Sequence, residues 1–248
     1  MPPAVLPEFE RRWAFFLDLD GTLLEIAATP DAVDPDYREL ELLGRLSRAA
    51  DGAVAVISGR SIARIDEILS PLLLPAAGQH GAERRDARGT RHRHRFAVKQ
   101  LKPAARGIRS FAARHQGLVF EDKGASVALH YRLAPEMAEK ALATVREAAE
   151  SLGDAVEVQR GKMVVELKPA GCDKGKAISE FMKEPPFAGR VPVFLGDDVT
   201  DEYGFRVVNR LGGHTIKVGE GASAARWRLA SPAAARAWLG DWVEFQKK

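Results

Sequence analysis

Phe15-Phe16-Leu17-Asp18-Leu19-Asp20-Gly21-Thr22-Leu23 is the stretch from which the fold is best predicted. The run from Trp13 to Leu17 is apolar without alternation, which is typical of a strand buried on both faces of a parallel sheet. It ends in Asp18 and Asp20, whose side chains point to the same side of an extended backbone. Because open α/β sheets bind ligands beyond the carboxyl ends of their strands, we expect a functional site here.

The two carboxylates also indicate the chemistry of that site. Held this close, they repel each other and need a cation between them or a shared proton. Mg²⁺ suits the role because it prefers hard oxygen ligands and usually keeps several waters and a substrate phosphate. The alternative is an acidic turn that caps the next helix. The buried strand before the pair and Gly21-Thr22 after it favour the metal site.

The composition of the 248 residues is that of a soluble globular protein with one or two domains. The formal net charge of +3 is small and gives no reason to expect a nucleic-acid partner. The sequence shows neither a signal peptide nor an apolar stretch of membrane-spanning length, so no membrane partner is expected. Cys172 is the single cysteine, which excludes an intrachain disulfide and favours a reducing cytoplasm. We expect a cytoplasmic monomer.

Further strands repeat the pattern of an apolar run that ends in polar residues. Residues 53–57 lead into Ser58-Gly59-Arg60, and residues 191–195 lead into Gly196-Asp197-Asp198. Between the strands, helical spacing follows helix-start signals such as Asp34, which precedes a proline. The fold class we predict is therefore α/β, with a Rossmann-like, doubly wound parallel sheet as its core.

The pattern changes between residues 85 and 167, where helix, hairpin, helix and hairpin follow one another. This order describes a small α+β module inserted as a cap domain. It divides the chain into a first core segment at 1–84, the cap at 85–167 and a second core segment at 168–248. The second hairpin is expected to turn at Arg160-Gly161. Charged residues share one face of the cap sheet, which is either a solvated face or one that binds sugar hydroxyls.

Single polar side chains at helix starts suit phosphate binding. Ser58 stands between a strand and a helix, where its hydroxyl and the helix amides can hold a phosphate oxygen. The alternative is that Ser58 or Ser61 merely caps the helix. Lys174 falls in the first turn of a helix capped by Asp173, where the dipole disfavours a cation unless it binds an anion. Asp201 and Glu202 also lie in a first turn, and the dipole alone accounts for them.

Phosphoryl transfer to a carboxylate needs this set of residues. We expect Asp18 to attack phosphorus and form an aspartyl phosphate, with Mg²⁺ between Asp18 and Asp197 to offset the charge repulsion. Ser58 and Lys174 would bind the charged phosphate oxygens. Asp20 would donate a proton to the leaving alcohol and then activate water.

The motifs D-L-D-G-T, I-S-G-R, K-G and G-D-D-V-T-D-E together resemble the haloacid dehalogenase-like superfamily over nearly the full chain. Within it, residues 78–83, 165–175 and 196–202 resemble the trehalose-phosphate phosphatases. The resemblance implies a small-molecule sugar phosphate as substrate, the hydrolysis of trehalose 6-phosphate in trehalose biosynthesis, and a Mg²⁺ cofactor. Other readings stay open: a phosphatase for sucrose 6-phosphate or a mannosyl phosphate, a mutase, or a non-catalytic sugar-phosphate sensor.

The resemblance also implies a role for each motif residue. Asp18 would be the nucleophile and Asp20 the acid and base. The metal would be held by the Asp18 carboxylate, the Asp20 carbonyl and Asp197, with Asp198 beside them and Asp201 supporting them. Phosphate would be bound by Ser58, Gly59 and Lys174, and the sugar by Arg60, His80, Glu121, Lys123 and Glu166.

Overall fold

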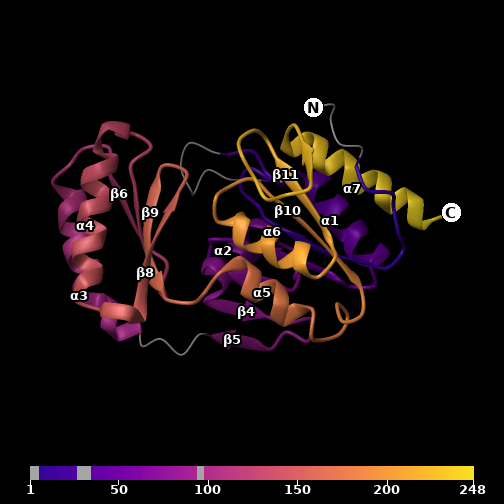
Figure 1. The fold of residues 1–248 in the computed structure, drawn as a ribbon, viewed down its shortest axis with the longest axis horizontal. Coiled ribbons are helices and arrows are strands. Elements are labelled where there is room, and N and C mark those ends of the chain that lie inside the picture. Colours follow the sequence, from indigo (N-terminus) through magenta and orange to yellow (C-terminus); the bar gives the residue numbers. More distant parts are fainter. Residues whose placement is uncertain (1–5, 27–34, 94–97) are drawn as a thin grey trace. The chain divides into compact units, whose positions relative to one another are not determined.

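The computed structural model of the chain describes residues 6–26, 35–93 and 98–248. The chain forms two compact units (Figure 1). The core unit consists of Met1–His92 with Asp173–Lys248, and the inserted unit consists of Arg93–Cys172. The core is thus built from both ends of the chain.

The inserted unit begins later than the expected residue 85, because the preceding strands extend the core sheet. Strand β4 (Glu83–Arg85) pairs with β3 (Ala76–Gly78) in antiparallel register, and β5 (Arg91–Arg93) lies next to β4. The unit also ends later than residue 167, since its last strand runs on to Pro169.

The core sheet has eight strands in the order β12-β11-β10-β1-β2-β3-β4-β5. At its centre is β1 (Trp13–Leu17), whose residues are all fully buried, as its unbroken apolar run predicts. Parallel pairing links β1 to β2 (Val54–Ile57) and β10 (Val191–Gly196), and continues to β3, β11 (His214–Val218) and β12 (Trp227–Leu229). The prediction of an α/β core with a mostly parallel sheet is confirmed.

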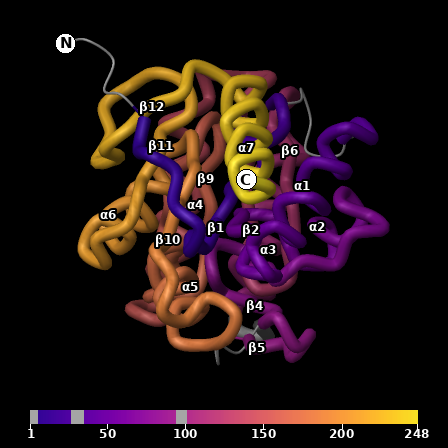
Figure 2. Tube along the Cα trace, turned by 90° about the vertical axis from the view of Figure 1, so that its right-hand side faces the viewer, coloured from indigo at the N-terminus to yellow at the C-terminus, as the bar shows by residue number. Residues whose placement is uncertain are grey.

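Helices cover both faces of the core sheet, as a doubly wound fold requires. Helices α1 (Tyr37–Ala49) and α7 (Pro232–Gln246) lie side by side on one face (Figure 2). Helices α5 (Lys174–Phe181) and α6 (Asp201–Arg210) pack together on the other. Helix α2 (Ile62–Ile68) follows β2 in the chain.

Helix α1 begins two residues later than expected. Its cap is Asp36, whose side chain accepts from the Glu39 amide while the Glu39 side chain accepts from the Asp36 amide, each at 3.0 Å. This reciprocal capping box satisfies two amides at once, which accounts for the later start. The expected cap, Asp34, lies outside the described residues.

The strand order reverses between β1 and β10. From β1 the chain proceeds to β2 and β3 on one side of it, and later from β10 to β11 and β12 on the other. Sheets of this kind bind ligands in the crevice at such a reversal. Asp18 directly follows β1 and Asp197 directly follows β10, so both lie at this position.

The inserted unit is a four-stranded antiparallel sheet, in the order β6-β7-β9-β8, with two helices packed against it. The elements in chain order are α3 (Val98–Ala113), β6 (Val119–Asp122), β7 (Val127–His130), α4 (Ala138–Glu150), β8 (Val156–Gly161) and β9 (Val164–Pro169). This confirms the predicted order of helix and hairpin. The predicted turn at Arg160-Gly161 is wrong, because both residues pair with β9 and the turn falls at Lys162-Met163.

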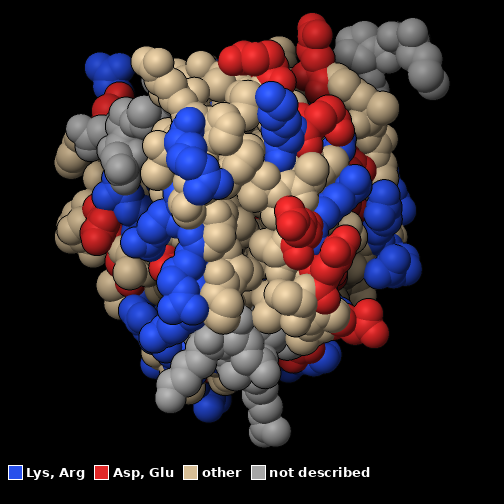
Figure 3. Space-filling view, turned by 90° about the vertical axis from the view of Figure 1, so that its left-hand side faces the viewer, with Lys and Arg blue, Asp and Glu red and all other residues tan. Residues whose placement is uncertain are grey.

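Figure 3 shows Lys and Arg gathered along the left side of the view, whereas Asp and Glu are interspersed with Lys and Arg on the right. Helix α3 contributes the exposed Lys102, Arg106 and Arg109 and contains no acidic residue.

Among the described residues, no helix is long and apolar enough to span a membrane.

Candidate active site

The turn after β1 holds Asp18 at the carboxyl end of the core sheet. The Asp18 amide donates to the Leu195 carbonyl of β10 (3.1 Å), which continues the parallel pairing beyond the strand. Thr22 Oγ1 donates to Asp18 Oδ2 (3.2 Å). The chain can turn back this tightly because Gly21 has a φ of +83°, which glycine adopts without strain. These contacts orient the Asp18 carboxylate at the strand end.

Lys174 lies between two carboxylates of the site. It is the first residue of α5, as predicted, and its Nζ lies 2.7 Å from both Asp18 Oδ1 and Asp201 Oδ1. All three residues are buried. Burial disfavours the ammonium form, but the charges of Asp18 and Asp201 more than offset this, so the pKa of Lys174 lies above its ordinary value. The cation therefore stays charged beside Asp18.

Asp201 supports the loop that follows β10. Its Oδ1 accepts from Lys174, and its Oδ2 accepts from the amides of Asp197 and Asp198, both at 2.9 Å. Gly196 leaves it room, since a Cβ there would lie 2.4 Å from Asp201 Cγ. These hydrogen bonds position the backbone of Asp197 and Asp198 next to the Asp201 carboxylate.

Three carboxylates of the site can hold a metal ion. Asp18, Asp197 and Asp201 each offer an oxygen, and these oxygens lie within 4.8 Å of one another. Hard oxygen ligands at this spacing fit a divalent cation such as Mg²⁺. Gly21 contributes to the fit, because a Cβ at this residue would lie 2.2 Å from Asp197 Oδ2.

Two carboxylates expected near the metal have other partners. Asp198 Oδ1 accepts from the Val199 amide (2.7 Å). The Asp20 carboxylate is held by Arg60, whose Nε donates to Oδ2 and whose Nη2 donates to Oδ1, each at 2.7 Å. Asp20 therefore faces Arg60, a residue that the sequence placed at the sugar.

The loop after β2 presents Ser58 to the same end of the sheet. Ser58 is 2% exposed, and its Oγ accepts from the Arg60 amide (3.1 Å). The cap of α2 is instead Ser61, whose Oγ accepts from the Arg64 amide (3.2 Å). The alternative that Ser58 or Ser61 caps this helix is therefore correct for Ser61 and wrong for Ser58.

Residues 78–83 support the Ser58 loop. The amides of Gln79 and His80 donate to the carbonyls of Arg60 (2.8 Å) and Ser58 (3.1 Å). The His80 ring packs on Gly59, where a Cβ would lie 2.7 Å from His80 Nε2. His80 is buried, and its contact in the core unit is with the loop that we expect to bind phosphate.

The expected sugar residues of the inserted unit form hydrogen-bonded groups on its sheet. Glu166 is 3% exposed, and it accepts from Ser126 Oγ (2.6 Å) and Lys123 Nζ (2.9 Å). Glu121 lies 2.8 Å from His130 Nε2. Burial raises the pKa of Glu121, but the His130 hydrogen bond and the Lys123 charge more than offset this and hold it below its ordinary value. Glu166 is thus held in a buried group, whereas the pair of Glu121 and His130 is half-buried, so the freely solvated alternative does not describe Glu166.

Several buried polar residues were missed by the sequence analysis, among them Thr22, Ser126 and Lys217. Ser126 is the hydroxyl donor to Glu166. Lys217 of β11 donates to the Asp197 carbonyl. A signal for Lys217 does exist: it is a lysine between Ile216 and Val218 in a buried strand, where an ammonium group needs a partner.

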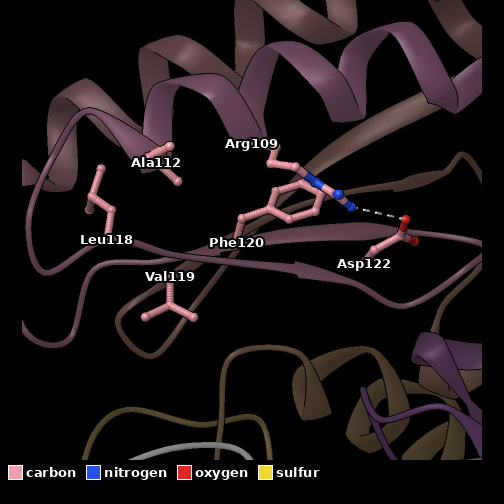
Figure 4. A pocket seen from close by; sticks show the side chains of 7 residues that line it. Arg109, Ala112, Leu118, Val119, Phe120 and Asp122 are labelled. Atoms are coloured by element: carbon pink, nitrogen blue, oxygen red, sulfur yellow. Dashed lines mark ion pairs between the residues drawn. The ribbon is translucent and has the colours of Figure 1, made fainter.

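The inserted unit also has a hollow of about 500 Å³ between α3 and β6 (Figure 4). Arg109 lies over the Phe120 ring, 4.7 Å from its centroid, and 3.8 Å from Asp122. None of the expected site residues lines this hollow.

The sequence matches the family model described as trehalose-phosphatase over residues 16–233. A trehalose-6-phosphate phosphatase of Escherichia coli is 46% identical over 238 residues, which cover 96% of this chain and 89% of that protein.

Two solved structures resemble this one. The crystal structure of a trehalose-6-phosphate phosphatase related protein has a TM-score of 0.79 and 31% identity, covering 94% of this chain and 99% of that one. The C-terminal domain of the Candida albicans trehalose-6-phosphate phosphatase has a TM-score of 0.83 and covers 94% of this chain and 92% of that one. Because the second structure is only 23% identical in sequence, its similarity supports the fold alone.

Proposed function

Because the chain belongs to the trehalose-phosphatase family, with its haloacid dehalogenase-like fold, we propose that it hydrolyses trehalose 6-phosphate to trehalose and inorganic phosphate. The reaction would use Mg²⁺ and an aspartyl-phosphate intermediate. The observation that carries this proposal is the buried contact of Lys174 with Asp18, within a cluster of three carboxylates at the strand-order reversal.

Asp18 would attack phosphorus. Its carboxylate is oriented by Thr22 and neutralised by Lys174, which lowers the repulsion that a phosphate dianion would meet. The bond from the Asp18 oxygen to phosphorus forms as the bond from phosphorus to the sugar oxygen breaks. Ser58 and Lys174 would bind the remaining phosphate oxygens.

Asp20 would move the proton in both half-reactions. In the first, its carboxylic acid protonates the sugar oxygen as it leaves. In the second, the resulting carboxylate takes a proton from water, whose oxygen attacks the phosphorus of the aspartyl phosphate and frees Asp18. Arg60 would keep the carboxylate form of Asp20 oriented through two parallel bonds, one to each oxygen, and one of these bonds would have to open for Asp20 to carry the proton that it gives to the sugar oxygen.

Asp18 and Asp197 would hold the Mg²⁺ ion, with Asp201 positioning the loop that carries Asp197. The bound ion would supply charge neutralisation for the phosphate oxygens. The backbone carbonyl of Asp20 would be a further ligand of the ion.

Side chains of the inserted unit would bind the glucose unit of the substrate that lies beyond the phosphate. Lys123 and Ser126 hold Glu166, and His130 holds Glu121, so these side chains are preorganised. A network with charged donors and acceptors suits sugar hydroxyls, which offer both. Such preorganisation keeps the cost of ordering these side chains on binding low.

The test is phosphate release from trehalose 6-phosphate, sucrose 6-phosphate and glucose 6-phosphate, each with Mg²⁺ and with EDTA. We expect an EDTA-sensitive preference for trehalose 6-phosphate. Preference for another sugar phosphate would contradict the substrate assignment but would agree with the proposed chemistry of the core unit. Absence of release by folded protein would favour the sensor alternative.

A matched pair of variants tests the nucleophile. Asp18→Asn should abolish release, whereas Asp241→Asn, an exposed change on α7, should leave it intact. Retained turnover in a folded Asp18→Asn protein would contradict the assignment.

A further inference from the structure

We propose that Lys217 is a positioning residue for the metal-binding carboxylate Asp197. The inference rests on the metal site proposed above and adds to it a residue outside the sequence motifs. Lys217 lies on β11, next to β10, and its Cα partner in the parallel register is Gly196, the residue before Asp197. It is 6% exposed, and its ammonium donates to the backbone carbonyl of Asp197.

The contact matters because of where Asp197 stands. Strand β10 ends at Gly196, so the Asp197 carbonyl lies beyond the regular ladder. A backbone group at this point needs another partner to keep a single orientation. Lys217 supplies a charged donor, which makes a stronger bond to a carbonyl than a neutral one.

The peptide group between Asp197 and Asp198 is consequently held at both ends. Its carbonyl accepts from Lys217, and its N–H donates to Asp201 Oδ2 (2.9 Å). A peptide group is planar, so two fixed ends set its rotation and with it the ψ angle of Asp197. The direction of the Asp197 side chain from its Cα depends on that geometry.

A third contact completes the placement. The Asp197 carboxylate rests against Gly21, where a Cβ would lie 2.2 Å from Oδ2. Hydrogen bonds thus fix the peptide groups before and after Asp197, and Gly21 limits the position of its carboxylate. This carboxylate lies near that of Asp18. Lys217 also brings positive charge to the loop after β10, where Asp197 and Asp198 are adjacent. The fixed orientation favours a carboxylate ready to bind a cation, and it has to outweigh the repulsion between the Lys217 charge and that cation.

The experiment measures metal binding directly, with Mn²⁺ as a spectroscopic substitute for Mg²⁺ and electron paramagnetic resonance as the readout, in the absence of substrate. Lys217→Met keeps most of the side-chain volume and removes the charge and the donor. We expect it to weaken Mn²⁺ binding by about 10-fold or more, in the range found for residues that orient metal ligands. Lys217→Arg, which keeps a charged donor, should restore part of the affinity.

Lys183→Met is the matched control, because Lys183 is an exposed lysine of the same unit. It should bind Mn²⁺ like the wild type. A second readout is the backbone amide resonance of Asp198, which belongs to the peptide group that Lys217 contacts. This resonance should shift in Lys217→Met and stay in place in Lys183→Met.

The outcomes separate the two proposals. Wild-type protein that binds no Mn²⁺ or Mg²⁺ would overturn the metal site and this inference with it. Wild-type binding together with unchanged binding by folded Lys217→Met would overturn the role of Lys217 alone. Should Lys217→Met not fold, Lys217→Gln carries the same comparison, since it removes the charge and keeps a shorter donor.

Discussion

Arg60 holds Asp20 through two hydrogen bonds of 2.7 Å, one to each carboxylate oxygen. The two residues come from the loops after neighbouring strands, β2 and β1. The pair therefore couples the loop expected to bind phosphate to the proposed acid and base. We therefore propose that Arg60 acts on Asp20, a role different from the sugar contact that the family resemblance implied.

Arg60→Lys tests this role, because a lysine cannot reproduce the paired bonds of a guanidinium. We expect kcat for trehalose 6-phosphate to fall by on the order of 10-fold or more, as part of the benefit of general acid catalysis is lost. The loss should be smaller with 4-nitrophenyl phosphate, whose leaving group needs little protonation. Steady-state kinetics on both substrates provide the measurement. A rise in KM for the sugar phosphate with unchanged kcat would instead assign Arg60 to the sugar, and Arg64→Lys serves as the control.

Glu166→Gln tests sugar recognition by the inserted unit. The change removes the charge that accepts from Lys123 and Ser126 while keeping the side-chain size. Hydrogen bonds with charged groups contribute about 1.5–3 kcal/mol, so kcat/KM for trehalose 6-phosphate should fall by roughly 10- to 100-fold. Turnover of 4-nitrophenyl phosphate should change little, and Glu139→Gln, exposed on α4, should affect neither. Equal losses on both substrates would mean that Glu166 does not read the sugar.

His214 makes folding stability depend on pH. Its ring lies 5.0 Å from the rings of both Trp13 and Trp227, and its Nε2 is 3.6 Å from Glu10 Oε1. Burial lowers the pKa of His214, which Glu10 offsets only in part. The unfolded chain therefore takes up this proton more readily, so stability should fall as pH drops below about 6.5 and level off below the folded pKa.

The measurement is the free energy of unfolding in urea between pH 7.5 and pH 5. His214→Phe keeps an aromatic ring between the tryptophans and removes the titrating group. The variant should lose less stability than the wild type over this range. Parallel pH profiles for the two proteins would show that His214 does not contribute.

The fold could be predicted from the sequence wherever a local pattern of residues contains the physical reason for the structure. The apolar run of residues 13–17 can only be satisfied by burial on both faces, and β1 is indeed fully buried. The acidic ends of β1 and β10 then meet because parallel neighbours end on the same side. Lys174 was predictable as a misplaced cation in a first turn, for which Asp18 and Asp201 are the anionic partners.

Contacts between segments that are far apart in the sequence could not be predicted from such local patterns. The pairing of Arg60 with Asp20 joins residues 40 positions apart, and the contact of Lys217 with Asp197 joins strands whose register no pattern reveals. The turn at Lys162-Met163 was missed because Arg160-Gly161 has the more typical turn composition, while Met163 adopts a φ of +61°. Cross-strand pairing outweighed local preference there.

Gly21 and Gly89 provide a matched pair to test the fit of the metal site. Both have a φ of +83°, so alanine at either position brings the same backbone strain, of about 1–2 kcal/mol. A Cβ at Gly89 meets nothing within 4 Å, whereas a Cβ at Gly21 would lie 2.2 Å from Asp197 Oδ2. Gly89→Ala should therefore lose about 1–2 kcal/mol of unfolding free energy and keep full phosphatase activity.

Gly21→Ala should lose more stability than Gly89→Ala, by roughly a further 1–3 kcal/mol for the overpacking. It should also bind Mn²⁺ more weakly, because the Asp197 carboxylate must move away from Asp18 to make room. Urea unfolding and Mn²⁺ binding on both variants separate backbone strain from displacement of the carboxylate. Equal stability losses with unchanged Mn²⁺ binding would show that Asp197 relaxes without cost, and would remove Gly21 from the group of residues that shape the site.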